Sequence, residues 1–300
     1  EEAITDKTKV IMPVDFAGLP ADYTSLLNLV NTSKIKSLYT PNNENQKKIG
    51  IILIVSDAAH SLGASFYNEN HKCLADITIY SLHAVKNFTT AEGGAIAINL
   101  PSEFDNEQVY KEMRLLSLNC QTKDALAKTK PGNWKYDIIG LGLKINMPDV
   151  NAANGLGQLI HFKSLSERRK EIFKRYSLGF SKYDWAKLPK SINGDVESSY
   201  HLFPLRFPDL DEIKRDRLIE LISLEEVAVN VHFIPMPMLT YFKHLGFNII
   251  DYPMAYENYS TEISIPLYPQ LTNESVDFII ETVVSSFQTL MSELLILREV

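Results

Sequence analysis

The stretch ADITIYSLHAVKNFTTAEGGAIAINL, residues 75–100, holds two apolar segments separated by a polar one. The run DITIY (76–80) and the run GGAIAINL (93–100) have the length and side chains of β-strands. Residues 81–92 between them show neither helical nor strand periodicity. Connections of this length without secondary structure are uncommon in compact domains and are usually functional. The stretch therefore predicts two strands joined by a functional loop.

A further strand is predicted upstream, at IILIV (51–55). A continuous apolar run of this length is typical of a parallel sheet that is buried on both faces. The run ends at Ser56-Asp57, so Asp57 is expected at the carboxyl end of a central strand, where open α/β sheets bind ligands. Other elements are expected around it: a short buried strand and turn (9–18), a helix (20–33) and a polar surface loop (38–50).

The second half of the chain predicts a long helix over 148–180, with Pro148 in its first turn. Gly155 and Gly157 in this helix indicate close packing or a break. Its expected apolar stripe consists of Val150, Ala153, Leu159, Phe162 and Leu165. Strands are predicted at 200–207 and 227–233, and an amphipathic helix at 273–295. We expect a large domain over 1–165 and a smaller C-terminal α/β domain over 166–300.

Composition excludes several classes of function. The net charge is −7, and no stretch clusters Lys and Arg with aromatic residues on one face, so nucleic acid and anionic membranes are not expected partners. No apolar run reaches the roughly 18 residues of a membrane span. The cysteines, Cys73 and Cys120, give no disulfide framework or zinc spacing. His71 lies near Cys73, but no second ligand pair follows, so no metal site and a reduced cytoplasmic protein are predicted.

Three side chains with useful chemistry follow these strands. Asp57 ends one strand, Ser81 ends the next, and Lys86 lies in the loop after it. Pyridoxal phosphate (PLP) needs a lysine amine for its aldehyde and an acid for its ring nitrogen. Its phosphate needs hydroxyl and N–H donors. The spacing fits this cofactor, but from the spacing alone a solvated loop lysine is the favoured interpretation of Lys86.

The order of several motifs resembles the DegT/StrS-type sugar aminotransferase family. The segments are SDAAHSLGASF (56–66), ADITIYSLHAVKNFTTAEGGAIAIN (75–99), GLKINMPDVNAANGLGQL (142–159), VNVHFIPMP (229–237), SIPLYPQLTNESVDFIIETV (264–283) and KTKVIMPVDFAGLPAD (7–22). Together they extend over nearly the whole chain. The resemblance implies a PLP-dependent aminotransferase of fold type I, with a mixed and mostly parallel sheet in the large domain.

The resemblance also implies roles for single residues. Lys86 would be the Schiff-base lysine and proton shuttle, Asp57 the partner of the pyridinium nitrogen, and Ser81 a phosphate donor. His60 would lie beside the cofactor ring. His83, next to the lysine, would meet substrate. Family members with His in place of the lysine are dehydratases, so Lys86 favours transamination.

The family further implies a homodimer that transfers an amino group, usually from glutamate, to a keto sugar on a nucleotide. Lys144 would reach the cofactor phosphate of the partner subunit, where a cation suits a phosphate. His232 would lie on the substrate side. The pathway would be amino-sugar or surface-polysaccharide synthesis.

Family members carry a further N-terminal segment, with a Ser/Asn-Gly-Thr-x-Ala turn that holds the cofactor phosphate. The chain contains no such turn. We therefore expect the large domain to be N-terminally incomplete and PLP binding by these residues alone to be weak. The alternative is a catalytically weak or inactive remnant that acts as a binding protein.

Simpler structural roles remain open for the same residues. Asp57 could be the N-cap of a helix formed by the following AAHS (58–61) as well as meet a cofactor. Ser81 could be a turn residue, and Glu92 could fix the loop. Ordinary packing could account for a further group: His60, His83, His232, Trp134 and Tyr136.

Overall fold

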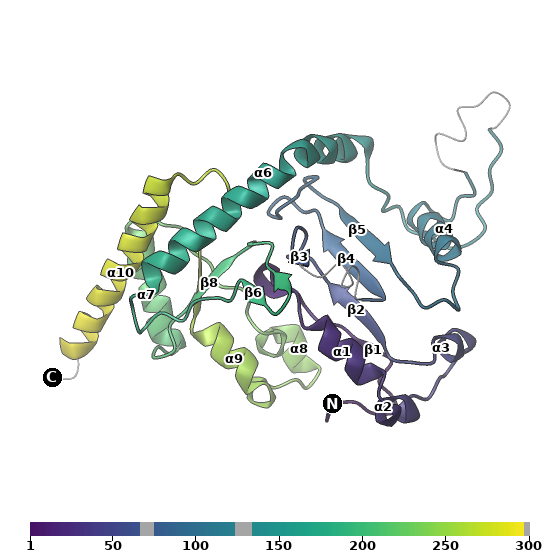
Figure 1. The fold of residues 1–300 in the computed structure, drawn as a ribbon, viewed down its shortest axis with the longest axis horizontal. Helices are drawn as coiled ribbons and strands as arrows, with labels where there is room; N and C mark the ends of the chain where they lie inside the picture. Colours follow the sequence, from purple (N-terminus) through teal and green to yellow (C-terminus); the bar gives the residue numbers. More distant parts are fainter. Residues whose placement is uncertain (67–74, 124–133, 297–300) are drawn as a thin grey trace. The chain divides into compact units, whose positions relative to one another are not determined.

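The structure is a computed structural model that describes residues 1–66, 75–123 and 134–296. The chain divides into two compact units (Figure 1). Unit 1 comprises residues 1–16, 20–62 and 66–161, and unit 2 comprises residues 17–19, 63–65 and 162–300. The domain limits at 165 and 166 stay a prediction. Each unit is described by itself below.

A four-stranded sheet organises unit 1. Its strands are β1 (Val10–Ile11), β2 (Leu53–Asp57), β4 (Ile77–Ser81) and β5 (Gly94–Ile98), in the order β1-β2-β4-β5 (Figure 1). β1, β2 and β4 run parallel, whereas β5 is antiparallel to β4. The predicted α/β class with a mixed, mostly parallel sheet is therefore confirmed.

Short helices accompany this sheet: α1 (Tyr23–Val30), α2 (Ser33–Leu38), α3 (Glu44–Ile49) and α4 (Asn106–Ser117). Asp22 caps α1 by accepting a hydrogen bond from the Ser25 N–H at 2.9 Å. The buried apolar cluster of the unit consists of Tyr23, Val30, Ile35, Ile52, Ile54 and Ala75. It joins the helix predicted over 20–33 to the strand predicted over 51–55.

Two predictions for the N-terminal region were wrong. The polar segment 38–50 contains α3, because Asn43 caps its start and Gly50, in the left-handed region at φ 68°, ends it. A two-turn surface helix needs no apolar stripe, so periodicity could not reveal it. The strand predicted within residues 9–18 exists as β1, but it is not buried, since Val10 is 44% exposed.

Helix α6 (Asp149–Phe180) confirms the long predicted helix, and the boundary between the units falls within it, after His161. The apolar stripe was placed wrongly, since Val150 is 82% exposed and Leu159 is also exposed. The helix instead buries a face near its C-terminal end, in the core of unit 2. That face consists of Arg169, Ile172, Phe173, Tyr176 and Phe180.

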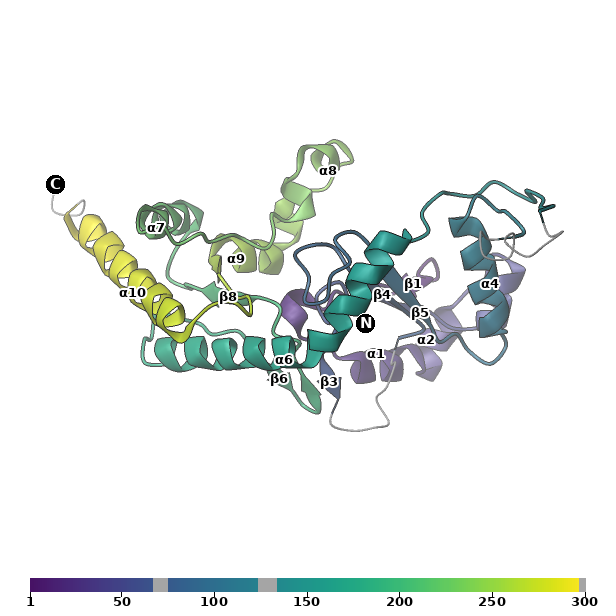
Figure 2. The same ribbon diagram turned by 90° about the horizontal axis from the view of Figure 1, so that it is seen from above.

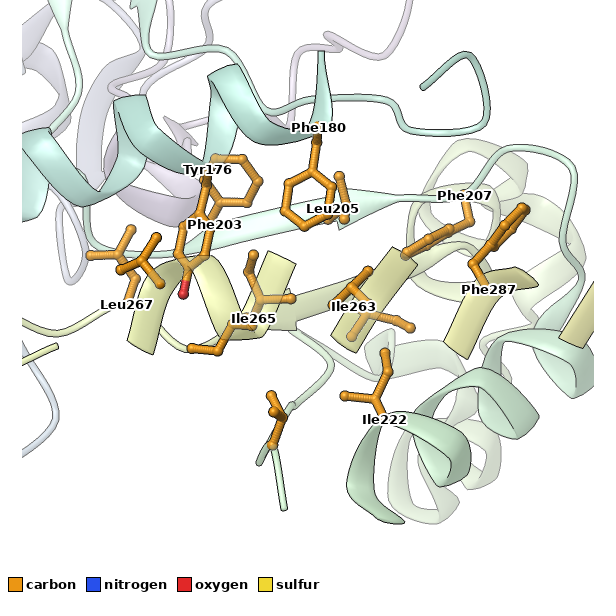
Figure 3. Close-up of a cluster of buried hydrophobic side chains, with 14 of the residues drawn as sticks. Tyr176, Phe180, Phe203, Leu205, Phe207, Ile222, Ile263, Ile265, Leu267 and Phe287 are labelled. Atoms are coloured by element: carbon orange, nitrogen blue, oxygen red, sulfur yellow. The ribbon is translucent and has the colours of Figure 1, made fainter. Parts of the chain in front are cut away.

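Unit 2 is built on an antiparallel pair, β8 (Phe203–Arg206) and β9 (Glu262–Ile265). Helices α7 (Glu212–Leu224) and α10 (Asn273–Ile296) pack against each other beside this pair (Figure 2). The core contains the residues labelled in Figure 3: Tyr176, Phe180, Phe203, Leu205, Phe207, Ile222, Ile263, Ile265, Leu267 and Phe287. Trp185 stacks on Phe287, with ring centroids 4.3 Å apart.

The remaining elements of unit 2 are short. β7 (Val196–Glu197) lies between β3 (Ser65–Phe66) and β6 (Ile192–Asn193) in a small sheet. Between α7 and β9 the chain forms four helical segments: η3 (Met236–Met238), α8 (Thr240–His244), η4 (Ile249–Asp251) and α9 (Pro253–Ser260). One more 3₁₀ turn, η1 (Phe16–Gly18), follows β1.

The strand predicted over 227–233 is absent as a regular strand. Only Asn230 pairs with β9, through a bridge to Ser264 in which both residues exchange backbone hydrogen bonds of 3.1 and 2.7 Å. The alternation of side chains also fails, because Val227 is buried whereas Phe233 is 58% exposed. Alternating apolar residues cannot distinguish a strand from a single bridge.

Helix α10 confirms the predicted C-terminal amphipathic helix. It is long and apolar enough to cross a membrane by length and composition. Its apolar residues serve the core of unit 2 instead, with Val276, Val283 and Leu290 almost fully buried. No uninterrupted apolar run of about 18 residues marks this helix in the sequence, so a helix of membrane-spanning length and composition was not predicted here.

Candidate active site

Asp57 is the last residue of the central strand β2, as predicted. Its backbone N–H donates to Pro13 O at 2.9 Å, and the next N–H, of Ala58, donates to Ile79 O at 2.9 Å. Neighbouring strands therefore hold the carboxyl end of β2 on both sides. The Asp57 carboxylate accepts a hydrogen bond from the Ala59 N–H at 3.1 Å. This bond fixes the turn that follows, but residues 58–61 form no helix, so the predicted role of Asp57 as a helix N-cap is wrong.

The loop over 81–92 folds back on the strands that it connects. Leu82 lies where the two ends of the loop meet. Its N–H donates to Gly93 O and its carbonyl accepts from the Thr90 N–H, each at 2.9 Å. Inside the loop, the Lys86 N–H donates to His83 O at 3.0 Å. The functional loop predicted from the lack of periodicity is thus a closed structure that holds Lys86.

Two glycines allow close packing around this loop. A Cβ on Gly93 would overlap Thr90 Oγ1 and would lie 2.8 Å from Met147 Cε. A Cβ on Gly155, in α6, would lie 2.8 Å from Thr90 Cγ2. The close packing predicted for Gly155 is therefore confirmed, whereas Gly157 has no neighbouring atom within 4 Å of that position.

The surroundings of Lys86 shift the pKa of its ammonium in two opposite directions. Partial burial lowers the pKa of the Lys86 ammonium, and the negative charge of Asp57 opposes that effect. Burial disfavours the charged form of an amine, whereas a nearby carboxylate favours it. The sheet thus brings a lysine with a lowered pKa into the field of the carboxylate that ends β2.

Ser81 and His83 lie on the same edge. Ser81 ends β4, and its Oγ accepts a hydrogen bond from the His83 N–H at 3.4 Å. His83 Nε2 lies 3.6 Å from Glu92 Oε1, and both side chains are substantially exposed. His83 is therefore not a packed core histidine, and Glu92 contacts it from the far end of the loop.

His60 is buried, 9% exposed, and its ring lies 6.4 Å from that of Phe16. Lys144 is exposed, and its ammonium donates to Asn146 Oδ1. His232 belongs to unit 2, where its Nδ1 lies 2.8 Å from Ser264 Oγ. Trp134 is 70% exposed, so packing in a core does not account for it.

Sequence reasoning missed a buried polar cluster beneath Asp57. Asp15 accepts hydrogen bonds from Tyr23 Oη and from Ser61 Oγ, each at 2.6 Å, and Tyr23 also contacts Ser56 Oγ. Burial, followed by the bond to Asp15, raises the pKa of the Tyr23 phenol. An acidic residue directly after an apolar strand was the signal that identified Asp57, and MPVD (12–15) carries the same signal.

The residues present fit pyridoxal phosphate. An amine whose pKa burial has lowered suits an aldehyde, because its neutral form is the nucleophile. Asp57 supplies a carboxylate that is close enough to affect the pKa of this amine, and Ser81 supplies a hydroxyl at the same sheet edge. No group of three His, Cys, Asp or Glu side chains in the described part of the chain could hold a metal ion. His71 and Cys73 lie outside the described residues.

Comparisons with known proteins agree with this site. The model of the DegT/DnrJ/EryC1/StrS aminotransferase family matches residues 43–284. The putative sugar aminotransferase Spr1654 from Streptococcus pneumoniae, in its PMP form, is 42% identical, with a TM-score of 0.89. The match covers 96% of this chain and 72% of that chain. The PLP form of that protein is 40% identical, with a TM-score of 0.88.

Two curated relatives are similar over the same length. The uncharacterized protein MJ1066 from Methanocaldococcus jannaschii is 32% identical over 94% of this chain and 68% of its own length. The spore coat polysaccharide biosynthesis protein SpsC from Bacillus subtilis is 29% identical, with the same coverage of both chains. The fold and the comparisons together define a PLP-dependent aminotransferase of fold type I. The chain belongs to the DegT/DnrJ/EryC1/StrS aminotransferase family.

Proposed function

We propose that this protein transfers an amino group from glutamate to a keto sugar carried on a nucleotide, in amino-sugar or surface-polysaccharide synthesis. The observation that carries the proposal is the placement of Asp57 at the carboxyl end of β2 and of Lys86 in the closed loop that follows β4, the parallel neighbour of β2. The names of two relatives support the substrate class: Spr1654 is described as a sugar aminotransferase and SpsC as a protein of spore coat polysaccharide synthesis.

The proposed roles follow from the chemistry of each side chain. Bound PLP supplies an aldehyde that takes up an amine and a ring that withdraws electrons when its nitrogen is protonated. Asp57 holds the proton on that nitrogen. Lys86 binds the aldehyde and later moves a proton at the amine-bearing carbon of the substrate. Ser81 donates a hydrogen bond to the phosphate.

The histidines would orient the reactants. His60, which is buried, would lie beside the cofactor ring, as the resemblance to the family implies. His83, which is half-exposed and next to Lys86, would contact substrate. His232 would act on the substrate side.

The assembly and location are part of the same proposal. We propose a cytoplasmic homodimer in which Lys144 reaches the cofactor phosphate of the partner subunit. The exposure of Lys144 supports this role, because an exposed ammonium can meet a phosphate in a partner subunit. Sedimentation velocity of the wild-type chain and of Lys144→Ala, with and without PLP, tests this assembly.

The direct test is to find the lysine that takes up PLP. The chain is incubated with PLP, reduced with borohydride, digested and analysed by mass spectrometry. We expect the label on the peptide that contains Lys86. Lys86→Arg should lose this label, whereas Lys111→Arg, which removes an exposed lysine on α4, should keep it.

A second measurement separates the enzyme from the inactive remnant. Glutamate should convert bound PLP to the amine form, as read by the loss of visible absorbance, and a panel of nucleotide-linked keto sugars should restore it. Label on Lys86 without glutamate conversion would favour a binding protein. Label distributed over exposed lysines, with none preferred, would contradict the proposed site.

A further inference from the structure

A second, buried carboxylate lies beside the strand end that carries Asp57. Asp15 is 3% exposed and follows β1, the parallel neighbour of β2. Its backbone N–H donates to Asp57 O at 3.0 Å, and the Asp57 N–H donates to Pro13 O at 2.9 Å. The two aspartates therefore lie at the same end of adjacent strands, and both belong to unit 1.

Both oxygens of the Asp15 carboxylate have donors. Oδ1 accepts from Tyr23 Oη at 2.6 Å and from the Ala21 N–H at 3.0 Å. Oδ2 accepts from Ser61 Oγ at 2.6 Å. A carboxylate is stable in a protein interior only where such donors replace water, and hydrogen bonds to a charged acceptor are stronger than those between neutral groups. Asp15 therefore fixes the groups that donate to it.

One of these donors, Ser61, ends the turn over residues 57–61 that begins at Asp57. The first end of this turn is held by the backbone bonds of β2, and its last residue is held by the bond from Ser61 Oγ to Asp15. Between the two ends, the Ala59 N–H donates to the Asp57 carboxylate at 3.1 Å. The donor that orients the Asp57 carboxylate thus lies in a segment that is anchored at both ends.

We propose that Asp15 is a positioning residue that anchors this turn through the hydroxyl of Ser61. The anchor keeps the Asp57 carboxylate in the place from which it acts on Lys86 and on the ring nitrogen of a bound cofactor. The contact with the cofactor rests on the proposed function. The anchor itself rests only on hydrogen bonds within unit 1, and it is testable without PLP.

Lys86 reports the position of the Asp57 carboxylate. Burial lowers the pKa of the Lys86 ammonium, and the charge of Asp57 raises it by a smaller amount. If the turn loses its anchor, the Asp57 carboxylate moves among several positions, and its effect on Lys86 weakens. A loss of stability does not by itself change the pKa of Lys86 in the folded chain. The titration of Lys86 therefore separates positioning from stability.

The experiment is competitive acetylation of the full chain with acetic anhydride from neutral to alkaline pH, with the peptide that contains Lys86 quantified by mass spectrometry. Only the neutral amine reacts, so the labelling rate follows its deprotonation. Asp57→Asn gives the full effect, because it removes the charge. In Ser61→Ala we expect Lys86 to be labelled about threefold faster than in the wild-type chain at neutral pH, and more slowly than in Asp57→Asn.

Substitutions of Asp15 test the anchor from its other end. Asp15→Ala should increase the labelling of Lys86 as Ser61→Ala does. Asp15→Asn is the conservative variant: its oxygen accepts from Tyr23, and its NH₂ group donates to the Ser61 oxygen. The bond to Ser61 is then kept in the reverse direction, so Asp15→Asn should restore labelling to near the wild-type rate.

Tyr23→Phe is the matched control, because it removes a donor from the same carboxylate and leaves the bond from Ser61 in place. It should lower stability without changing the labelling of Lys86. Slow hydrogen exchange in β4 confirms that unit 1 is folded in every variant, since both neighbouring strands pair with β4.

Two results would overturn the proposal. One is labelling of Lys86 at the wild-type rate in both Ser61→Ala and Asp15→Ala. The other is an equal increase in Ser61→Ala and Tyr23→Phe, because the carboxylate would then serve stability alone. Neither result touches the proposed aminotransferase function, which the PLP label on Lys86 tests separately.

Discussion

The carboxylate of Asp57, at the end of β2, raises the pKa of the Lys86 amine, in the loop after β4, against the lowering caused by burial. Because burial is the larger effect, the amine loses its proton below its ordinary pKa of 10.5. A catalyst that uses a lysine as nucleophile needs this balance, since only the neutral amine attacks a carbonyl group.

Asp57→Asn should shift that balance in a defined direction. Removing the negative charge takes away the effect that raises the Lys86 pKa, so borohydride-trapped PLP at Lys86 should reach its plateau at a lower pH than in the wild-type chain. Amino transfer should fall by about 10²-fold or more, because a preorganised charge at the reacting centre is lost. Glu103→Gln, an exposed change elsewhere in unit 1, is the control. A trapping profile that stays at the wild-type pH would contradict the coupling.

Gly155→Ala and Gly157→Ala form a matched pair in α6. Both should gain up to about 1 kcal/mol of helix propensity. At Gly155 the new methyl group would lie 2.8 Å from Thr90 Cγ2, whereas at Gly157 it meets nothing. We expect thermal unfolding to show a stabilised Gly157→Ala and a destabilised Gly155→Ala. PLP labelling of Lys86 should drop in Gly155→Ala alone. Equal behaviour of both variants would mean that the loop does not depend on this contact.

Tyr23→Phe removes one donor from the buried carboxylate of Asp15. Asp15 keeps the hydrogen bonds from Ser61 Oγ and from the Ala21 N–H, so the expected cost is about 1–3 kcal/mol in the free energy of unfolding. Urea denaturation measures it. Tyr39→Phe is the matched control, because that hydroxyl makes one partly buried bond of 3.2 Å to Gln46 O. A loss for Tyr23→Phe no larger than for Tyr39→Phe would show that the cluster is unimportant for stability.

Glu262 should make the stability of unit 2 depend on pH. Its pKa is raised from 4.5 to about 7, so its protonated form is favoured by folding. That contribution is complete below pH 4.5 and is lost as pH rises through 7, by about 3 kcal/mol in total. Unfolding of Trp134→Phe, followed by Trp185 fluorescence, should show this slope. Adding Glu262→Gln should abolish this pH dependence of stability, whereas adding Glu257→Gln should leave it unchanged. If the pH dependence persists in Glu262→Gln, another titrating group causes it.

Continuous apolar runs predicted strands reliably, whereas apolar periodicity was less reliable for helices and single bridges, and this difference has a physical reason. Apolar runs at 51–55 and 76–80 predicted β2 and β4, because a strand buried in a sheet needs apolar side chains on both faces. The short helix α3 and the single bridge at Asn230 escaped prediction, because caps and one backbone pair leave little apolar periodicity. The stripe on α6 failed because periodicity cannot say which part of a long helix reaches a core.

The sequence by itself determined the order of strands and loops that carries Asp57, Ser81 and Lys86, because each residue lies at or just after a strand end. The resemblance of its motifs to the family then predicted PLP as the cofactor. Only the tertiary structure decided which groups influence one another. Parallel pairing of β2 and β4 brings Asp57 and Lys86 into electrostatic range, and the antiparallel bridge at Asn230 sets His232 against Glu262. Proton positions and pKa values depend on burial and on partners distant in the chain, and these exist only after folding.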